Sequence, residues 1–422
     1  MLLHHERAIQ KMDEYGFDAI VAAIPRNVYY ASGYWTRISE FGFQENHAAV
    51  IIPRDPDKPA TLILPEFAVA ALLEHPTWIP AVRPTEFLNT SIIAHEPEPV
   101  RLDPLQADVE RLYQEKVVAN LAPNIVAAMI DALKALGLAS SRVAFDDLRL
   151  AQHVQADLSG LRVLDAHDCW LDIRKVKTQK EIELLRAGAR INQDAIYEIL
   201  PMIRPGVVWK DIATHFRHFI MDRGANLISS QKALQFGAEY GGEFFPDLMF
   251  ESNDWKVFDG QCIIFETWGT YANYAFDCSR TVHVGEPPRD YADMCAAIAA
   301  GQQEVEKHIR AGVTTHDLFL IASKVIDSMP VPTPRKTLLF LHSLGLDIIE
   351  QPSTYPAFGQ IKSFELEENT VLNYEFLYFG HTLAPFHLES SYLITKNGFE
   401  CFHTMPQQLM VVAAGESVGA SR

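Results

Sequence analysis

Short apolar runs alternate with helical patterns over the first 165 residues of the chain. Apolar residues at helical spacing predict helices at 2–15 and 118–136. Runs of aliphatic and β-branched residues predict strands at 18–24, 47–52, 60–64, 142–145 and 162–164. The segment 83–104 carries proline and acids without a period, which predicts a loop. Strands that alternate with helices favour a mixed sheet with covered faces, so we expect a separate α/β domain at 1–165.

The pattern changes near Asp168, where a new helix and an internal repeat begin. Thr178 and Glu181 have the spacing of a capping box. Farther on, Ile-Arg-Pro-Gly-Val at 203–207 recurs as Ile-Arg-Ala-Gly-Val at 309–313. Each copy lies between two predicted helices, at 181–200 and 209–223 and then at 290–308 and 315–329. Turn chemistry alone is the alternative explanation, but the pair predicts a duplicated, pseudo-twofold domain at 166–422.

A predicted hairpin within this domain carries the first candidate chemistry. Residues 262–265 read as one strand, 268–273 as the turn and 274–284 as the return strand. Glu266 and Asp277 lie on different strands, so their carboxylates can converge across the ladder. Burying an ionised carboxylate is costly unless a cation or a hydrogen-bond network offsets the cost. A metal ion is therefore one explanation, and an edge hairpin with two solvated acids is the other.

Three more polar residues interrupt apolar segments downstream. His342 follows Leu-Leu-Phe-Leu, Glu375 lies in the middle of an apolar strand, and Glu389 lies within another strand. Single residues of this kind are commonly hydrogen-bonded core residues rather than ligands. Glu375 is the hardest of the three to explain in that way, because both of its flanks predict a fully buried strand.

Composition and charge narrow the class of partner. The 422 residues are 48% hydrophobic with a net charge of −18, which disfavours nucleic acid and anionic membranes as partners and favours a small molecule or short peptide. No apolar run approaches the roughly 18 residues of a membrane span. The five cysteines are scattered without a CxxC pair, and the first residues lack a secretory pattern, so we expect a cytoplasmic protein.

Taken in order, the five candidates resemble the metal ligands of the pita-bread metallopeptidase superfamily, which includes prolidase, aminopeptidase P, methionine aminopeptidase and creatinase. Its ligands are Asp, Asp, His, Glu and Glu, and the matching residues here are Glu266, Asp277, His342, Glu375 and Glu389. Residues 277–281 match the D-x-[ST]-R-T signature, and 174–182 are similar to the R-x-x-K-x-x-x-E-[IL] entry segment of the longer members. The resemblance implies an α+β fold, with a duplicated pita-bread catalytic domain after a creatinase-like α/β N-terminal domain.

The resemblance also implies a cofactor, a catalytic residue and an assembly. One or two divalent ions, Mn, Fe, Co or Zn, would activate a water, and Glu375 would shuttle its proton. A homodimer is implied, in which the N-terminal domain of one subunit reaches over the site of the other. The aromatic residues Trp35, Phe41 and Phe43 fit that arrangement, although they fit equally well a role in covering their own domain.

Several positions depart from the family pattern. Glu266 stands where the family has Asp, and Phe244 and Ile349 stand where it has two substrate-binding histidines. His387 replaces the arginine of proline-specific members. We therefore expect an apolar wall, with the remaining polar groups orienting the substrate and His387 also acting in catalysis; these groups are Glu243, His381 and His387, with Trp35 from the N-terminal domain.

Three functions remain open at this point. The first is a metal-dependent hydrolase that cleaves a C–N bond in a small amide or an unusual dipeptide. The second is a metal-dependent lyase acting on a small carboxylated substrate, similar to the dimethylsulfoniopropionate lyase of this fold. The third is a catalytically inactive pita-bread binding module. Bound metal would separate the third from the others, and incorporation of solvent oxygen into product would separate hydrolase from lyase.

Overall fold

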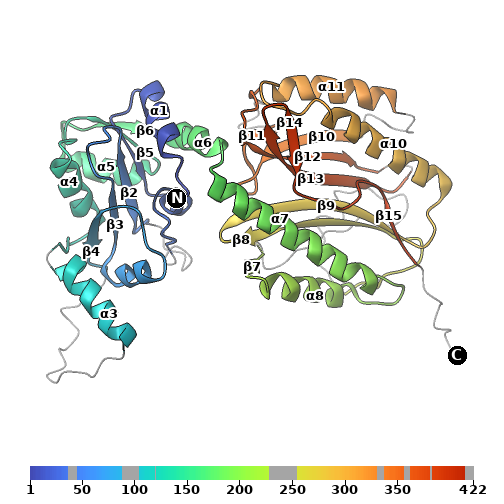
Figure 1. Cartoon of the computed structure of the whole chain (residues 1–422), viewed down its shortest axis with the longest axis horizontal. Helices are drawn as coiled ribbons and strands as arrows, with labels where there is room; N and C mark the ends of the chain where they lie inside the picture. Colours follow the sequence, from blue (N-terminus) through green and yellow to red (C-terminus); the bar gives the residue numbers. More distant parts are fainter. Residues whose placement is uncertain are drawn as a thin grey trace. The chain divides into compact units, whose positions relative to one another are not determined.

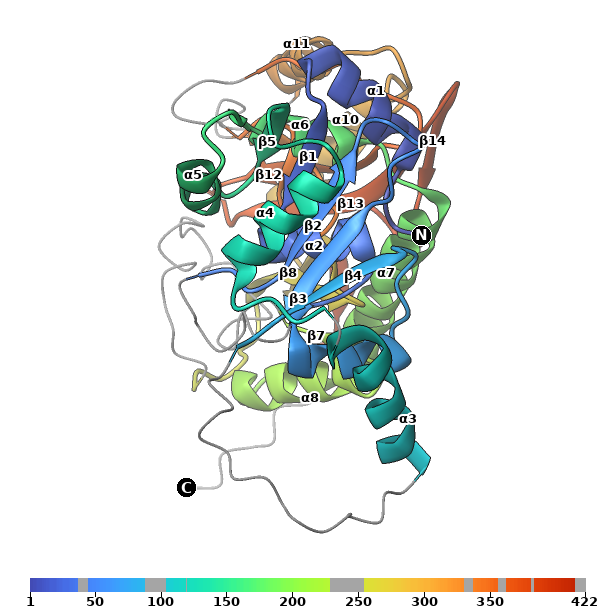
Figure 2. The same cartoon turned by 90° about the vertical axis from the view of Figure 1, so that its left-hand side faces the viewer.

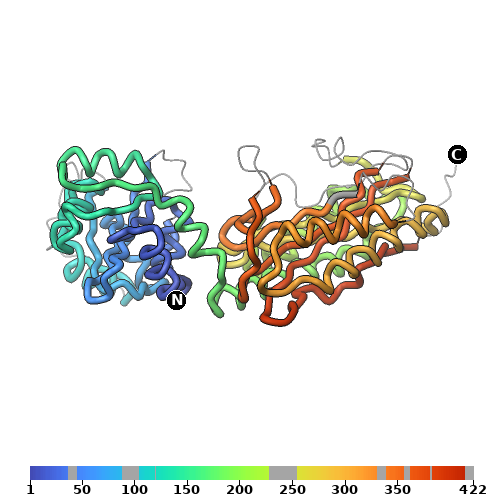
Figure 3. Tube along the Cα trace, turned by 90° about the horizontal axis from the view of Figure 1, so that it is seen from above, coloured from blue at the N-terminus to red at the C-terminus, as the bar shows by residue number. Residues whose placement is uncertain are grey.

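The computed structural model describes residues 1–36, 45–87, 104–118, 120–227, 254–329, 337–355, 362–380 and 383–413. The chain forms two compact units, Met1–Arg174 and Lys175–Arg422, and Figures 1 and 3 follow the chain through both. Helix α6 (His167–Lys175) ends at the division, whereas the sequence placed the domain boundary at 165. Within the described ranges, no helix has the combination of length and apolar character that crossing a bilayer requires.

The N-terminal unit contains the predicted mixed sheet. Its strands lie in the order β4-β3-β2-β1-β5-β6; β1 pairs antiparallel with β2, as β2 does with β3, and the other pairs are parallel. The elements are α1 (His5–Tyr15), β1 (Ala19–Ala22), α2 (Pro25–Ser32), β2 (Ala49–Pro53), β3 (Thr61–Pro65), η2 (Glu66–Leu73), β4 (Ala81–Thr85), α3 (Pro104–Tyr113), η4 (Gln114–Val118), α4 (Ile125–Ala135), β5 (Arg142–Phe145), α5 (Leu148–Asp157) and β6 (Arg162–Asp165).

One face of this sheet is packed under α4 and α5 (Figure 2). Val21, Ile51 and Phe145 of the strands are buried against Met129 and Leu133 of α4. The helix expected at 118–136 is shorter, because α4 begins only after Asn124, whose side chain accepts a hydrogen bond from the N–H of Ala127. An asparagine cap satisfies a backbone donor that has no partner within the helix and so fixes the start of the helix.

The C-terminal unit is a single long sheet with its helices on one side. Among the described residues, the strand order is β11-β10-β12-β13-β9-β8-β7, with β14 beside β13 and β15 beside β9. The elements are α7 (Gln179–Ile199), η5 (Leu200–Met202), α8 (Trp209–Met221), β7 (Ala225–Asn226), β8 (Cys262–Tyr271), β9 (Tyr274–Val284), α10 (Arg289–Glu306), α11 (Thr315–Ser328), β10 (Thr337–Ser343), β11 (Glu350–Ser353), β12 (Val371–Tyr378), β13 (Phe386–Thr395), β14 (Gly398–Cys401) and β15 (Met410–Val412).

The predicted duplication is visible in the backbone hydrogen bonds. Gly206 N–H donates to the carbonyl of Val257 at 2.8 Å, and Gly312 N–H donates to Leu366 at 2.9 Å. Both glycines have a positive φ, 91° and 84°, which an L side chain adopts only with strain. A two-stranded hairpin follows each copy, β8–β9 after the first and β12–β13 after the second. The two halves of the domain are therefore built on one plan.

The two faces of the sheet have different roles because successive strand residues point to opposite sides. One face is apolar: Phe265 and Phe276 pack under α7 and α8, and Tyr374, Phe376 and Leu388 pack under α10 and α11. The other face carries the polar candidates. Helices thus cover one face of the sheet and leave the opposite face for the site.

The β8–β9 hairpin differs from the expected one in its turn. The expected turn at 268–273 is wrong, because β8 continues to Tyr271 and the turn consists of Ala272 and Asn273 alone, with φ of 48° and 66°. Trp268 consequently pairs with Asp277, and Glu266 pairs with Ser279. The longer ladder places the Glu266 and Asp277 side chains on the same face, diagonally across the strand pair.

Candidate metal centre

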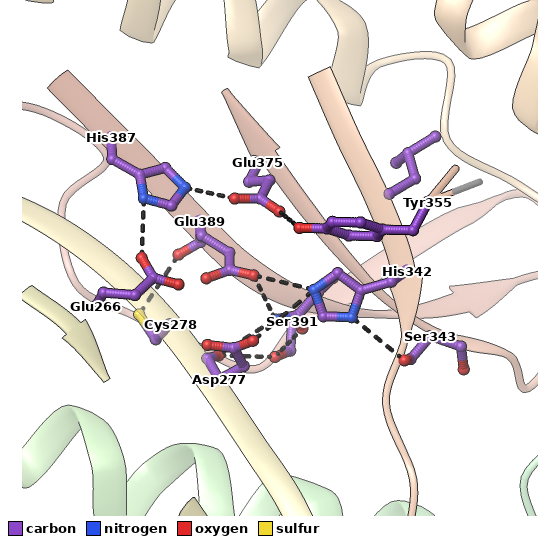
Figure 4. A network of polar contacts seen from close by, with 12 residues as sticks. Glu266, Asp277, Cys278, His342, Ser343, Tyr355, Glu375, His387, Glu389 and Ser391 are labelled. Carbon is purple, nitrogen blue, oxygen red and sulfur yellow. Dashed lines mark hydrogen bonds and ion pairs between the residues drawn. The ribbon is translucent and has the colours of Figure 1, made fainter. Parts of the chain in front are cut away.

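Strand register gathers the predicted ligands on the face of the sheet opposite the described helices. Glu389 of β13 pairs with Ser279 of β9 on one side and with Glu375 of β12 on the other. His342 of β10 pairs with Asn373, two residues before Glu375. The pairing of Glu389 with Ser279 joins strands whose paired residues are 110 positions apart in sequence. Figure 4 shows the side chains converging.

A first group consists of His342, Asp277 and Glu389. His342 Nε2 lies 3.4 Å from Glu389 Oε1 and 3.8 Å from Asp277 Oδ2. The other ring nitrogen, Nδ1, lies 3.3 Å from the carbonyl oxygen of Ser343, so a proton on Nδ1 leaves the Nε2 lone pair facing the carboxylates. Asn373 donates to Glu389 Oε1 at 2.8 Å and orients that carboxylate. The ligand atoms of the three residues lie within 4.8 Å of one another.

A second group surrounds His387. Its Nδ1 lies 2.8 Å from Glu266 Oε2, and its Nε2 lies 2.5 Å from Glu375 Oε2. The Tyr355 hydroxyl donates to the other oxygen of Glu375 at 3.5 Å. Glu266, His387 and Glu389 again offer ligand atoms within 4.8 Å of one another. Glu389 belongs to both groups, and Glu375 belongs to neither but contacts His387.

The signature at 277–281 supplies Asp277 and also forms hydrogen bonds with the backbone of the neighbouring strand β13. Arg280 is fully buried and donates to the carbonyl oxygen of Glu389 at 2.5 Å. Thr281 Oγ1 exchanges hydrogen bonds with the backbone of His387, at 3.0 Å to its carbonyl and 2.9 Å from its N–H. The arginine and the threonine thus fix the backbone of two site residues on β13.

Burial sets the electrostatics of the site. Burial raises the pKa of Glu266 to about 7, and burial together with the nearby carboxylate of Glu389 raises the pKa of Asp277 well above its usual range. Burial raises the pKa of Glu389, but His342, with smaller contributions from His387 and Asn373, outweighs burial, so the pKa is lowered overall. Burial would lower the pKa of His342 and His387, but the surrounding carboxylates outweigh it and raise both. The site therefore has a strong demand for positive charge.

The donor set fits divalent cations. Asp277 Oδ1 and Glu389 Oε2 are buried and have no hydrogen-bond partner among the described residues. Four ionised carboxylates would carry four negative charges, which two divalent ions would balance. Carboxylate oxygens with imidazole nitrogens suit Mn²⁺, Fe²⁺, Co²⁺ or Zn²⁺.

A cavity of about 320 Å³ opens onto these ligands. Its lining includes five of the predicted site residues, Glu266, Asp277, His342, Glu375 and Glu389, and the expected wall residue Ile349. Trp268, Ile348 and Tyr355 complete the described lining and were not singled out in the sequence. Their contribution depends on strand register and loop path, which no local motif reports.

The remaining predicted residues do not line the described part of the cavity. Glu243, Phe244, His381, Phe41 and Phe43 lie outside the described residues. Trp35 lies in the N-terminal unit, where its ring meets Tyr29 edge-on at 5.5 Å. His387 is 2% exposed and is enclosed by carboxylates of the site.

Two residues of the entry segment contact elements that adjoin the cavity residues in sequence. Lys177 forms a buried ion pair with Glu350 at 2.7 Å. Glu350 directly follows the cavity residues Ile348 and Ile349 in the sequence. Glu181 closes the capping box with Thr178 and accepts a hydrogen bond from the Tyr274 hydroxyl at 3.1 Å. The lysine and the glutamate of this segment thus attach the start of α7 to the loop and the hairpin beside the cavity.

Fold and site together define a pita-bread protein with an acidic centre containing two imidazoles. The chain belongs to metallopeptidase family M24, whose model matches residues 183–396; the Creatinase/Prolidase N-terminal domain matches residues 4–176. The resemblance inferred from the ligand order and the expected fold are both confirmed.

Solved structures agree with this fold. The X-Pro aminopeptidase from Thermotoga maritima superposes with a TM-score of 0.72 at 18% identity, covering 96% of this chain and 100% of that one. The prolidase from Pyrococcus furiosus gives a TM-score of 0.67 at 18% identity, covering 94% and 99%. Identities this low bear on the fold alone.

Sequence relatives are also distant. An uncharacterized peptidase of Staphylococcus epidermidis is 24% identical over 230 residues, which are 54% of this chain and 62% of that protein. A Xaa-Pro dipeptidase of Pyrococcus furiosus is 22% identical over 227 residues, again 54% and 62%. This chain thus spans 62% of the length of these two relatives.

Proposed function

We propose that the protein is a metal-dependent hydrolase that cleaves a C–N bond in a small amide or an unusual dipeptide. The observation that carries the proposal is the convergence of four carboxylates and the imidazole of His342 at one cavity, with the buried imidazole of His387 in contact with two of those carboxylates. A chain that had become a binding module would have no reason to keep this costly set of charges buried.

The residues have distinct roles in the proposal. Glu266, Asp277, His342 and Glu389 would hold one or two divalent ions, with Mn, Fe, Co and Zn as the candidates. A bound ion would polarise the scissile carbonyl and lower the pKa of the attacking water. Glu375 lines the cavity and accepts hydrogen bonds from Tyr355 and His387, so its carboxylate is placed to take a proton. A role for Glu375 as a further ligand stays a prediction.

The cavity favours a small substrate. Its volume of about 320 Å³ lies at the lower end of the range of ligand pockets, about 300 to 1,000 Å³. Ile349, 46% exposed, offers a hydrocarbon surface where Xaa-Pro peptidases would offer an imidazole. Losing a polar partner for a peptide carbonyl weakens discrimination by about 1 to 3 kcal/mol, so ordinary Xaa-Pro dipeptides should be poor substrates.

The relatives support hydrolysis, since the family and the named neighbours are peptidases. The five cysteines are free thiols, which fits a reducing compartment, and we place the activity in the cytoplasm.

The test is a substrate panel in ¹⁸O-labelled water. Protein stripped with a chelator would receive Mn²⁺, Fe²⁺, Co²⁺ or Zn²⁺ and be offered Xaa-Pro and Met-Xaa dipeptides, small amides, ureas and sulfonium acids. We expect turnover only with added metal, and one solvent oxygen in the acid product. Product without solvent oxygen would favour the lyase, and efficient cleavage of an ordinary Xaa-Pro dipeptide would contradict the account of the apolar wall.

A matched variant sharpens the test. Ile349→His restores an imidazole at the cavity wall and should raise the cleavage of Xaa-Pro dipeptides by about five- to 100-fold relative to small amides. Ile349→Leu keeps the wall apolar and should leave that ratio unchanged.

A further inference from the structure

The imidazole of His387 lies in a group of side chains that could hold a metal ion. Its ring is 2% exposed, with Nδ1 beside Glu266 Oε2 at 2.8 Å and Nε2 beside Glu375 Oε2 at 2.5 Å. Glu266, His387 and Glu389 form a group comparable to Asp277, His342 and Glu389, and Glu389 Oε2 is buried without a hydrogen-bond partner among the described residues. Each group therefore contains one imidazole.

The duplication places His387 where the first half has a ligand. Cys262 begins β8 and Val371 begins β12, so Glu266 and Glu375 occupy the same position in their strands. Trp268 pairs with Asp277 in the first hairpin, and Leu377, at the same position of β12, pairs with His387 in the second. The pairing of Ser279 with Glu389 then lies on the pseudo-twofold axis. His387 is the counterpart of Asp277.

The surroundings of the ring match those of a metal-binding histidine. Such a histidine commonly donates its second N–H to a carboxylate, which orients the ring. Glu375 Oε2 is in position to accept that hydrogen bond from His387 Nε2. Two donors bound side by side, about 2.1 Å from one ion, lie about 3 Å apart, close to the 2.8 Å between Nδ1 and Glu266 Oε2. Thr281 holds the backbone of the ring in this place.

We infer that His387 is a metal ligand through Nδ1, together with Glu266 and Glu389, so that the centre holds two divalent ions with one imidazole on each. The inference rests on the proposed metal-dependent function. The competing arrangement is an imidazolium that donates to Glu266 and Glu375 and takes the place of the second ion. In that case the centre would hold a single ion, at Asp277, His342 and Glu389.

Nitrogen NMR of the histidine rings distinguishes the two arrangements. Full-length protein labelled with [¹⁵N]histidine and freed of metal would be titrated with Zn²⁺, and the rings assigned with His342→Gln and His387→Gln. We expect two zinc equivalents, with one nitrogen of each ring moving to the position of a zinc-bound nitrogen. His387→Gln should lose the second equivalent or bind it at least about tenfold more weakly, while the His342 signal still responds.

The control is His215→Gln, which removes an exposed imidazole paired with Glu198 and should bind zinc like the unaltered protein. A His387 ring that stays protonated on both nitrogens at saturating zinc would overturn the inference and leave the proposed function standing. A His387→Gln variant that binds two zinc equivalents as tightly as the unaltered protein would also overturn the inference. Failure of the unaltered protein to bind zinc would overturn both. The titration of unaltered protein decides the matter even if a variant fails to fold.

Discussion

At the scale of single residues, the two halves of the C-terminal unit differ at the residue pair on the pseudo-twofold axis. Ser279 and Glu389 face each other across the pseudo-twofold axis, and only the second carries a carboxylate. A second glutamate there would add a like charge to a buried and already acidic site. The serine leaves Glu389 as the single acid shared by both ligand groups.

A buried acid outside the site makes stability depend on pH. Asp146 accepts hydrogen bonds from the N–H of Ala23 at 2.7 Å and from the Asn27 amide at 2.8 Å, yet burial raises its pKa to about 7. A folded pKa above the unfolded value near 4 means that the stabilisation is complete below pH 4 and is lost as pH rises through 7.

We therefore expect the melting temperature of the N-terminal unit to fall between pH 4 and 8. The fall should be smaller in the Asp146→Asn variant, which lacks the titrating carboxyl group. The slope of melting temperature against pH is the readout, because the amide also perturbs the hydrogen bonds. Asp147→Asn is the control with the opposite sign. The Arg149 hydrogen bonds outweigh burial and lower the pKa of Asp147, so its stabilisation is lost as pH falls. Equal slopes for Asp146→Asn and unaltered protein would refute this expectation.

At the scale of elements, the β8–β9 turn is a point of strain. Ala272 has a φ of 48°, a conformation that costs an L residue about 1 to 2 kcal/mol and that asparagine tolerates better. Ala272→Asn should raise the free energy of unfolding of the C-terminal unit by about 0.5 kcal/mol, measured by urea denaturation. Asn273→Ala should lower it by a similar amount. A destabilised Ala272→Asn variant would show that the alanine makes a contact worth more than the strain.

The same turn explains why the sequence predicted the hairpin but not its length. Two-residue turns of this kind usually have the sequence Asn-Gly or Asp-Gly. Ala-Asn contains the asparagine but not the glycine, so it predicts such a turn less strongly. Gly269 within β8 added a false signal for a loop, although the glycine is required there. A Cβ at Gly269 would lie 2.5 Å from the carbonyl oxygen of Asn226. By contrast, the capping box at Thr178 is a local pattern, and the structure contains it as the sequence predicted.

At the scale of the whole molecule, the duplicated plan was predictable because the repeat at 203–207 and 309–313 is written in the sequence, and the candidate ligands were found through the order in which they resemble those of the family. The contact of His387 with Glu266 was not predictable. It depends on the register of β13 against β9 and of β9 against β8, which a single sequence does not report. The role of Tyr355 in the site was not predicted for a similar reason. Its hydroxyl donates to Glu375, but Tyr355 belongs to no recognisable motif.

We also predict a homodimer in which the N-terminal unit of one subunit covers the site of the other, an arrangement that the family resemblance implies. Light scattering at micromolar concentration should give twice the mass of the 47.5 kDa chain. Trp35→Ser should weaken the dimer, whereas Trp78→Ser, also in the N-terminal unit, serves as the matched control. A monomer at that concentration would contradict the prediction.

The most direct test of the central claim is the metal content of the protein with and without Glu389. Equilibrium dialysis against Mn²⁺ or Zn²⁺, followed by elemental analysis, should find at least one stoichiometric ion in the unaltered protein. Glu389→Gln keeps the size of the side chain but removes the charge common to both ligand groups, so it should lose nearly all of that metal. Glu304→Gln, at an exposed position of α10, should bind like the unaltered protein. A protein that binds no metal, or a Glu389→Gln variant that binds it undiminished, would contradict the account.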